Sequence, residues 1–94
     1  AVNLLPDPSG PLALRFAGAG GASGEEKFSE GHWLGDAAGT PVLANAPVSF
    51  SCALTEAVEA GSHTIFIGRI VDIRLGDGAA LIFEQSRFHR LSPL

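Results

Sequence analysis

Three histidines, His32, His63 and His89, are the residues of this chain best suited to proton transfer or metal binding. They lie far apart and form neither an H-x-x-x-H nor an H-E-x-x-H pattern, so a zinc site is not indicated. His63 differs from the other two because it follows a Gly61-Ser62 turn and opens a long apolar run. A side chain there can face a cleft at the end of a sheet. The residues alone favour a structural histidine at a strand end, with a functional His63 as the alternative.

Nucleophilic catalysis is not indicated by the cysteine or by the serines. Cys52 is the only cysteine, so it has no intrachain disulfide partner and no second thiolate at zinc-ligand spacing. It shares a period-two pattern with Phe50 and Leu54, which favours a core position over an activated thiol. No G-x-S-x-G motif is present, and Glu25-Glu26 is more typical of a solvated charge cluster than of acid/base catalysis.

The run 17–24 contains only Gly, Ala and Ser, and it predicts a flexible loop with no side chain that anchors a core. It is not a dinucleotide-binding motif, because Ser23 stands where G-x-G-x-x-G needs its third glycine. Lys27-Phe28 follows this loop. We favour an anchor that fixes the end of the loop to the core. The alternative is a lid whose Phe covers a planar ligand while its Lys meets a phosphate or an electron-rich ring edge.

Size and composition limit the class of protein. The chain has 94 residues, of which 46% are apolar and 17% charged, so we expect one small ordered domain with a marginal core. Its net charge of −4 and its scattered basic residues argue against nucleic-acid binding. Its apolar runs are too short to span a membrane, and its first residues do not resemble a signal peptide. With a single cysteine, a reducing cytoplasmic setting is expected.

The order of turn and strand signals predicts a mainly β chain with short helices. A strand-like start over 2–5 leads through a Pro-rich turn to a short helix over 12–16, with Ser9 as its cap and Pro11 in its first turn. A helical turn is expected over 25–30. The remainder predicts a strand over 48–55 and a strand over 63–75 that has a bulge or bend at Gly68. A hairpin turn at 76–78 is expected to lead to a returning strand over 79–83 that pairs with 63–75. Phe88 and Leu91 are expected to anchor the tail.

Three antiparallel strands cannot seal a two-sided core, so further strands, a dimer partner or both are needed. The chain begins without Met and on an apolar run. We therefore expect residues 1–94 to be a fragment, or one product of a cleaved or divided chain, in which the remaining strands are supplied elsewhere.

Taken together, these segments resemble the short-chain flavin reductase family, the reductase components of two-component flavin-dependent monooxygenases. The Gly-x-His sequence followed by an apolar strand and a glycine is the most specific piece. The resemblance covers nearly the whole chain and runs through Val2–Leu5, Leu12–Gly18, Glu26–Phe28, Gly39–Leu43, the strand ending at Cys52, Gly61–Ile70, Ala80–Phe83, and Arg87, Phe88 and Leu91.

The resemblance implies a Greek-key split β-barrel of the FMN-binding type, of which this chain is an incomplete C-terminal part. It also implies a homodimer with FMN or FAD near the interface and NADH or NADPH as hydride donor. The reduced flavin then diffuses to a separate monooxygenase. The missing N-terminal strands, whether cleaved or present as a separate chain, supply most of the groups that hold the flavin phosphate.

Carried over by position, the resemblance assigns His63 as the catalytic residue beside the nicotinamide. No metal is implied. Ser62 stands where the family usually has Asp, and Phe88 where it commonly has Tyr. The residues assigned to cofactor binding are Asn3, Lys27 and Phe28 near the flavin, and Ser62, His63, Arg87 and Phe88 on the nicotinamide side.

Two other functions stay open. The same fold serves as a flavin-binding carrier or sensor without reductase turnover, and the Ser at position 62 encourages that alternative. The remaining alternative is a structural β-domain with no ligand.

Overall fold

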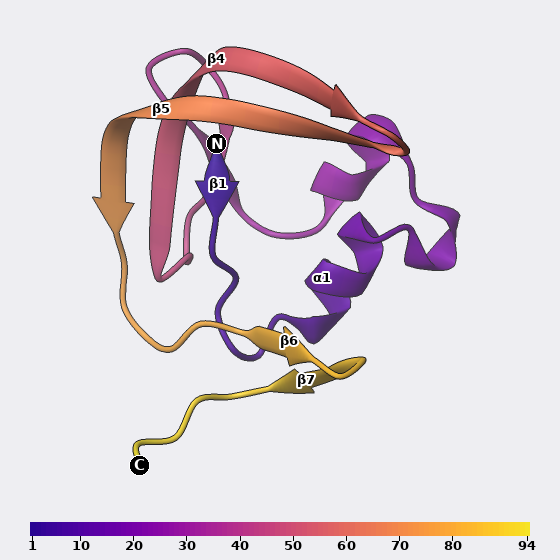
Figure 1. Ribbon diagram of the computed structural model, residues 1–94. Helices are drawn as coiled ribbons and strands as arrows, with labels where there is room; N and C mark the ends of the chain where they lie inside the picture. Colours follow the sequence, from indigo (N-terminus) through magenta and orange to yellow (C-terminus); the bar gives the residue numbers. More distant parts are fainter.

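Two long antiparallel strands, β4 (Val48–Ala60) and β5 (His63–Leu75), form the largest element of the structure, a computed structural model that describes residues 1–94 (Figure 1). The short strand β1 (Val2–Asn3) pairs with β4 on the side away from β5, so the sheet has the order β1-β4-β5. The other elements are α1 (Gly10–Phe16), the 3-10 segments η1 (Ala19–Gly21) and η2 (Gly24–Ser29), β2 (Trp33–Gly35), β3 (Pro41–Leu43), β6 (Ile82–Glu84) and β7 (Arg87–His89). The mainly β class with short helices is confirmed.

The expected strand over 63–75 has the bounds that its β-branched run predicts, and Gly61-Ser62 forms the turn before it. β4 continues beyond the expected end at residue 55, because Ala57 and Val58 pair across the hairpin with Phe66 and Ile65. The pairing partner therefore extends β4 through residues whose own pattern is weak.

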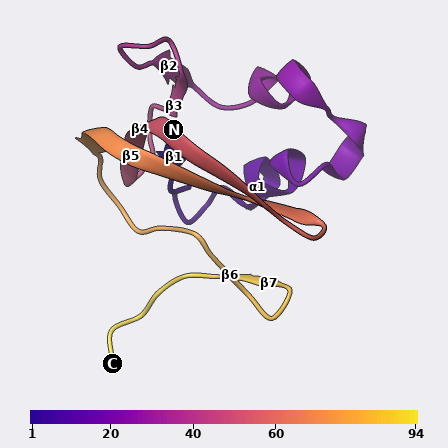
Figure 2. The same ribbon diagram turned by 45° about the horizontal axis from the view of Figure 1, so that its top comes forward.

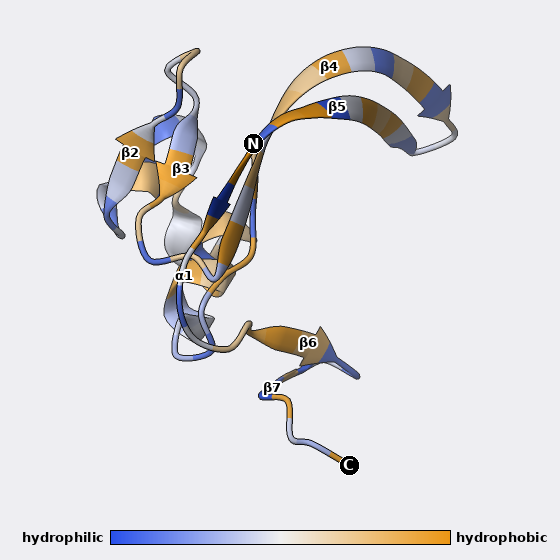
Figure 3. Ribbon diagram, turned by 90° about the vertical axis from the view of Figure 1, so that its left-hand side faces the viewer, coloured by the Kyte–Doolittle hydropathy of each residue, from blue (hydrophilic) through white to orange (hydrophobic).

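The irregularity expected at Gly68 is present. Between the Leu54–Gly68 pair and the next pair, Thr55 is an extra residue on β4, and its Oγ1 donates a hydrogen bond to the Ile67 carbonyl at 2.9 Å. Val71 is a second extra residue, on β5. Such bulges bend a strand and increase its twist. The hairpin accordingly curves away from the rest of the chain (Figure 3).

The expected pairing of 79–83 with 63–75 is wrong. Ala80 instead bridges Pro6, and Leu81 N donates to the Leu5 carbonyl at 2.7 Å, so this segment pairs with the chain that follows β1. β6 pairs with β7 through a two-residue turn in which both residues have positive φ, Gln85 at 50° and Ser86 at 60°. The partner is set by contacts distant in sequence, and turn residues alone do not reveal them.

Two smaller expectations are also corrected. Ser9 occupies the N-cap of α1 but makes no capping hydrogen bond through its side chain, although a proline does lie in the first turn. Ala22 is buried, so the run 17–24 does contribute a side chain to the packing, and part of it forms the 3-10 segment η1.

The buried core is small and lies where β3 crosses the base of β4. Its apolar members there are Val42, Leu43 and Ala46, and Ser49 and Ser51 on β4 are buried beside them. The β2–β3 hairpin therefore covers one face of the sheet near its base, while β6–β7 lies apart from it (Figures 1 and 2). None of the helices has the length and apolarity that crossing a bilayer requires.

Asp36 closes the loop between β2 and β3. Its Oδ1 accepts hydrogen bonds from the backbone N–H groups of Ala38 and Thr40, each at 2.9 Å. The hydrogen bond from Thr40 is the main cause that lowers the pKa of Asp36 below its ordinary value of 3.8. The ionised carboxylate therefore stabilises the folded hairpin.

This gives a pH-dependent prediction. Because the pKa of Asp36 is lower in the folded state, its contribution to stability is complete above the ordinary value of 3.8 and is lost as the pH falls through the lower folded pKa. We expect Asp36→Ala to lower the urea midpoint of the full-length protein at pH 7, and the difference from wild type to shrink at the most acidic pH. A difference that stays constant over this range contradicts the assignment.

Gly76 gives a second prediction. It follows β5, donates its N–H to the Pro47 carbonyl at 2.9 Å, and lies so close to the Ala46 carbonyl oxygen that an added Cβ would overlap it. We expect Gly76→Ala to lower the free energy of unfolding by about 1–3 kcal/mol, the range for overpacked sites. Gly35→Ala is the matched control, because its Cβ would meet its nearest neighbour at 3.6 Å. If urea unfolding shows equal losses of unfolding free energy for Gly76→Ala and Gly35→Ala, overpacking against the Ala46 carbonyl is ruled out as the cause.

Candidate functional site

An aromatic cleft lies between the start of the chain and the segments that flank the Gly/Ala loop. Its volume is about 430 Å³, and most of its lining is apolar. The residues that line it are Ala1, Asn3, Leu5, Phe16, Phe28, Trp33, Thr40 and Pro41. Two of the residues assigned to cofactor binding, Asn3 and Phe28, therefore meet in one cleft.

The walls of the aromatic cleft are three rings packed against one another. The centroid of Phe28 lies 5.0 Å from those of both Phe16 and Trp33, in edge-to-face arrangements with interplanar angles of 88° and 72°. The Trp33 indole N–H donates to the Glu30 carbonyl at 2.8 Å, which fixes that ring. Each such pair contributes about 0.5–1.5 kcal/mol beyond its buried area. The cleft thus has aromatic walls that are formed before any ligand arrives.

Two cations close the base of the Gly/Ala loop. Arg15 Nη2 donates to the Glu26 carbonyl and to Ser29 Oγ, each at 2.7 Å, and Lys27 Nζ donates to the Phe16 carbonyl at 2.9 Å. The loop is thereby held at both ends. The Lys27 contact agrees with the anchor interpretation, while a contact from Lys27 to a phosphate stays a prediction.

Asn3 is held in the cleft by hydrogen bonds within the chain. Its Oδ1 accepts from the Leu43 N–H at 3.0 Å and from Ser49 Oγ at 2.7 Å, and its Nδ2 donates to the Pro41 carbonyl at 3.4 Å. The side chain connects β1, β3 and β4. Asn3 therefore shapes the back of the aromatic cleft.

Ser62 and His63 lie at the far end of the β4–β5 hairpin. Both are exposed, and Ser62 Oγ lies 2.9 Å from His63 Nδ1. The imidazole is not packed inside a closed core. In Figure 3 this end of the hairpin projects away from α1 and from the two small hairpins.

Arg87 and Phe88 lie on β7. The Phe88 ring packs at 5.2 Å from the ring of Phe83 and also lies against Gly10 at the start of α1. Phe88 therefore contacts α1 as an anchor of the tail would, although it is 38% exposed, whereas Leu91 is 68% exposed and does not act as the expected anchor. The seven assigned residues consequently fall on separate parts of the structure: Asn3 and Phe28 in the aromatic cleft, Lys27 at the base of the Gly/Ala loop, Ser62 and His63 at the β4–β5 turn, and Arg87 and Phe88 on β7.

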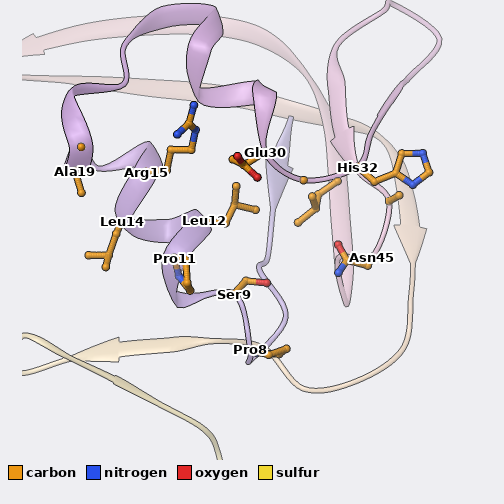
Figure 4. Close-up of a pocket in the computed structure, with 14 residues that line it drawn as sticks. Pro8, Ser9, Pro11, Leu12, Leu14, Arg15, Ala19, Glu30, His32 and Asn45 are labelled. Carbon is orange, nitrogen blue, oxygen red and sulfur yellow. The ribbon is translucent and has the colours of Figure 1, made fainter.

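A second cleft of about 840 Å³ is lined in part by α1 (Figure 4). Its polar lining includes Arg15, Glu30, His32 and Asn45, and none of the residues assigned from the resemblance lines it. Arg15 Nε is buried there without an acceptor. No three His, Cys, Asp or Glu side chains in the structure are grouped to hold a metal ion.

Sequence reasoning did not single out Phe16 and Trp33 as lining residues. The available signal was compositional, because Trp33 is the only tryptophan and no tyrosine is present, which leaves few aromatic side chains to build a planar site. Their convergence on Phe28 depends on the fold of the loop and could not be read from spacing.

The aromatic cleft fits the planar part of a flavin, because ring faces and edges are what an isoalloxazine packs against. It offers no cation for a phosphate, since no Lys or Arg lines it and Lys27 Nζ donates to the Phe16 carbonyl beside it. The ring would thus be held by these residues, and the phosphate requires groups from outside the described cleft.

Comparison with known proteins identifies the family of the chain. The family model for the flavin reductase like domain matches residues 1–92. An FMN reductase (NADH) RutF of Pseudomonas syringae is 35% identical over 91 residues, and a 4-hydroxyphenylacetate 3-monooxygenase reductase component of Klebsiella oxytoca is 32% identical over 89. These alignments cover 96% and 94% of this chain but only 50% and 52% of the relatives. The chain spans about half the length of the curated relatives it matches.

A solved structure has the same architecture. BorF, the flavin reductase component of a bacterial two-component tryptophan halogenase, aligns with a TM-score of 0.82 and 29% identity, over 98% of this chain and 59% of that one. Structural similarity to flavin reductases such as BorF confirms the expected split-barrel class. From the family match and the shared fold, the chain belongs to the flavin reductase like domain family.

Proposed function

We propose that this chain forms part of a reductase that uses NADH or NADPH to reduce FMN or FAD, and that the reduced flavin serves a separate monooxygenase. The observation that carries the proposal is the aromatic cleft, which joins Asn3 and Phe28 in a member of the flavin reductase like domain family. The names of the relatives, an NADH-dependent FMN reductase and a monooxygenase reductase component, support the donor and the destination.

The bound flavin supplies the chemistry, because its ring accepts a hydride from the nicotinamide. The protein then has to bind, orient and exclude water. In this proposal Phe28 packs against the flavin, Asn3 holds the back of the cleft in shape, and His63 lies at the edge of the nicotinamide. Arg87 and Phe88 cover the nicotinamide side, and Lys27 keeps the loop closed.

Completion of the site requires further protein, because every residue of β5 is exposed. One face of the hairpin is an open apolar surface formed by Phe50, Cys52, Leu54, Phe66 and Ile70. Since side chains alternate along a strand, Ile65 and Ile67 project from the opposite face, and they are 53% and 47% exposed. Figure 3 shows hydrophobic residues along both strands.

The two faces of the hairpin both expose apolar side chains, so further polypeptide is needed on each face to bury them. We propose that N-terminal strands, in the same chain or a separate one, cover the face that carries Phe66, and that a second subunit of a homodimer covers the face that carries Ile65. This arrangement brings His63, at the end of the same hairpin, to a boundary between subunits. The free Cys52 is consistent with a reducing, cytoplasmic location.

The proposal is tested by following the oxidation of NADH and NADPH by the full-length protein, with FMN, with FAD and with neither. We expect oxidation only when a flavin is added, and the two flavins and two donors to be ranked by kcat/KM. No oxidation with either flavin would exclude a reductase. Tight retention of flavin with negligible oxidation would instead identify a carrier or sensor, and a colourless protein with no flavin affinity would identify a structural domain.

His63 gives a prediction within the same assay. We expect His63→Ala to slow flavin reduction more than it weakens flavin binding, by roughly 5- to 30-fold in kcat/KM, as for a lost hydrogen bond of about 1–2 kcal/mol. His32→Ala is the matched control, because His32 is exposed and lines the second cleft. Lower flavin affinity with an unchanged rate of hydride transfer would place His63 at the flavin and not at the nicotinamide.

A further inference from the structure

The imidazole of His63 has one hydrogen-bond partner in the chain, the hydroxyl of Ser62. Ser62 Oγ lies 2.9 Å from His63 Nδ1, and no other hydrogen bond or ion pair reaches the ring. The nearest acidic residue in the strand register is Glu59, which pairs with Thr64 and forms no ion pair with His63. Nε2 is therefore the ring nitrogen that is free for a ligand.

The partner of Nδ1 decides where the proton of a neutral imidazole resides. A hydroxyl can donate to Nδ1, and the proton of the ring then lies on Nε2. A carboxylate at the same place could only accept, which would put the proton on Nδ1 and leave Nε2 as an acceptor. A hydroxyl can also accept, so it is compatible with a proton on either ring nitrogen, whereas a carboxylate is compatible only with a proton on Nδ1. The residue at position 62 thus determines whether Nε2 can carry the proton and donate to a ligand.

We propose that Ser62 is a positioning residue, whose hydroxyl donates to Nδ1 and so lets His63 act as an Nε2–H donor to the carbonyl oxygen of the nicotinamide carboxamide. The identification of the nicotinamide as the ligand of His63 rests on the proposed function. Ser62 does not bind the cofactor in this account. It acts through His63, and the hydrogen bond also restricts rotation of a ring that the exposed hairpin end would otherwise leave free.

The first test measures the tautomer directly. Side-chain ¹⁵N spectra of the full-length protein are recorded at about pH 8.5, where imidazoles are neutral, and the His63 signals are assigned by their loss in His63→Ala. We expect the Nε2–H form in wild type and in Ser62→Thr, which keeps the hydroxyl, and a shift to the Nδ1–H form in Ser62→Asp. Ser92→Asp, which adds the same charge in the exposed tail, is the control and should leave the spectrum unchanged.

The second test uses an analogue of the donor. The reduced 3-acetylpyridine analogue of NADH keeps the carbonyl oxygen but lacks the amide N–H. We expect the ratio of its KM to that of NADH to rise roughly fivefold in Ser62→Asp, as for one lost hydrogen bond, and to be preserved in Ser62→Thr. Comparing a ratio within each variant removes any general loss of stability or activity.

The outcomes separate the two proposals. An Nδ1–H tautomer in wild type, or no tautomer change in Ser62→Asp, overturns the role of Ser62 whether or not the protein oxidises NADH. A tautomer change without a change in the KM ratio overturns the selection of the carboxamide oxygen. Absence of any flavin-dependent oxidation refutes the proposed function, and the spectra still decide the tautomer.

Discussion

The hydrogen bonds of the Asn3 carboxamide connect β1 to β3 and β4, and the candidate site and the sheet both depend on this connection. Its Oδ1 accepts from the Leu43 backbone and from the Ser49 hydroxyl, both of them in the buried core. Asn3 itself is half-buried, and an intramolecular hydrogen bond of this kind contributes about 0.5–1.5 kcal/mol, which matters for a core this small. The same side chain fixes the back of the aromatic cleft and the base of the β4–β5 hairpin, so the site and the sheet depend on one group.

The second constraint is the imbalance between the length of the hairpin and the size of the core. The core covers only the base of β4, while β5 is exposed along its whole length. Apolar side chains such as Phe66 and Ile70, 68% and 51% exposed, favour burial by about 25 cal/mol for each Å² removed from water. This drives association with further polypeptide. It also explains why the assigned residues lie on separate elements, since the protein that would bring them together is the protein that covers the hairpin.

The parts that the sequence predicted are those in which a local pattern decides the structure. The β-branched run predicted the bounds of β5, and Gly68 marked the bulge because a glycine inside a strand often does so. In the structure a Cβ there would meet the Cβ of Cys52 at 3.1 Å. The parts that it missed depend on distant partners. Ala80 and Leu81 join the segment after β1, and the three residues of β2 are too few to show a period. The site divides in the same way: the resemblance supplied Asn3 and Phe28, but the Phe16 and Trp33 walls needed the folded loop.

The two halves of the proposed site also differ in how much order they have before a ligand binds. The rings of the aromatic cleft already pack against one another, and Arg15 and Lys27 hold the ends of the adjoining Gly/Ala loop. A planar ring that enters the cleft would therefore lose little further conformational entropy in the protein. Ser62 and His63 lie in water at the end of a projecting hairpin, where one hydrogen bond contributes little. In the proposed homodimer a second subunit would cover that end, and the lower local dielectric would strengthen the same hydrogen bond and make an unpaired Nε2–H costly. Assembly would thus turn an exposed imidazole into a selective donor without any change in the chain that carries it.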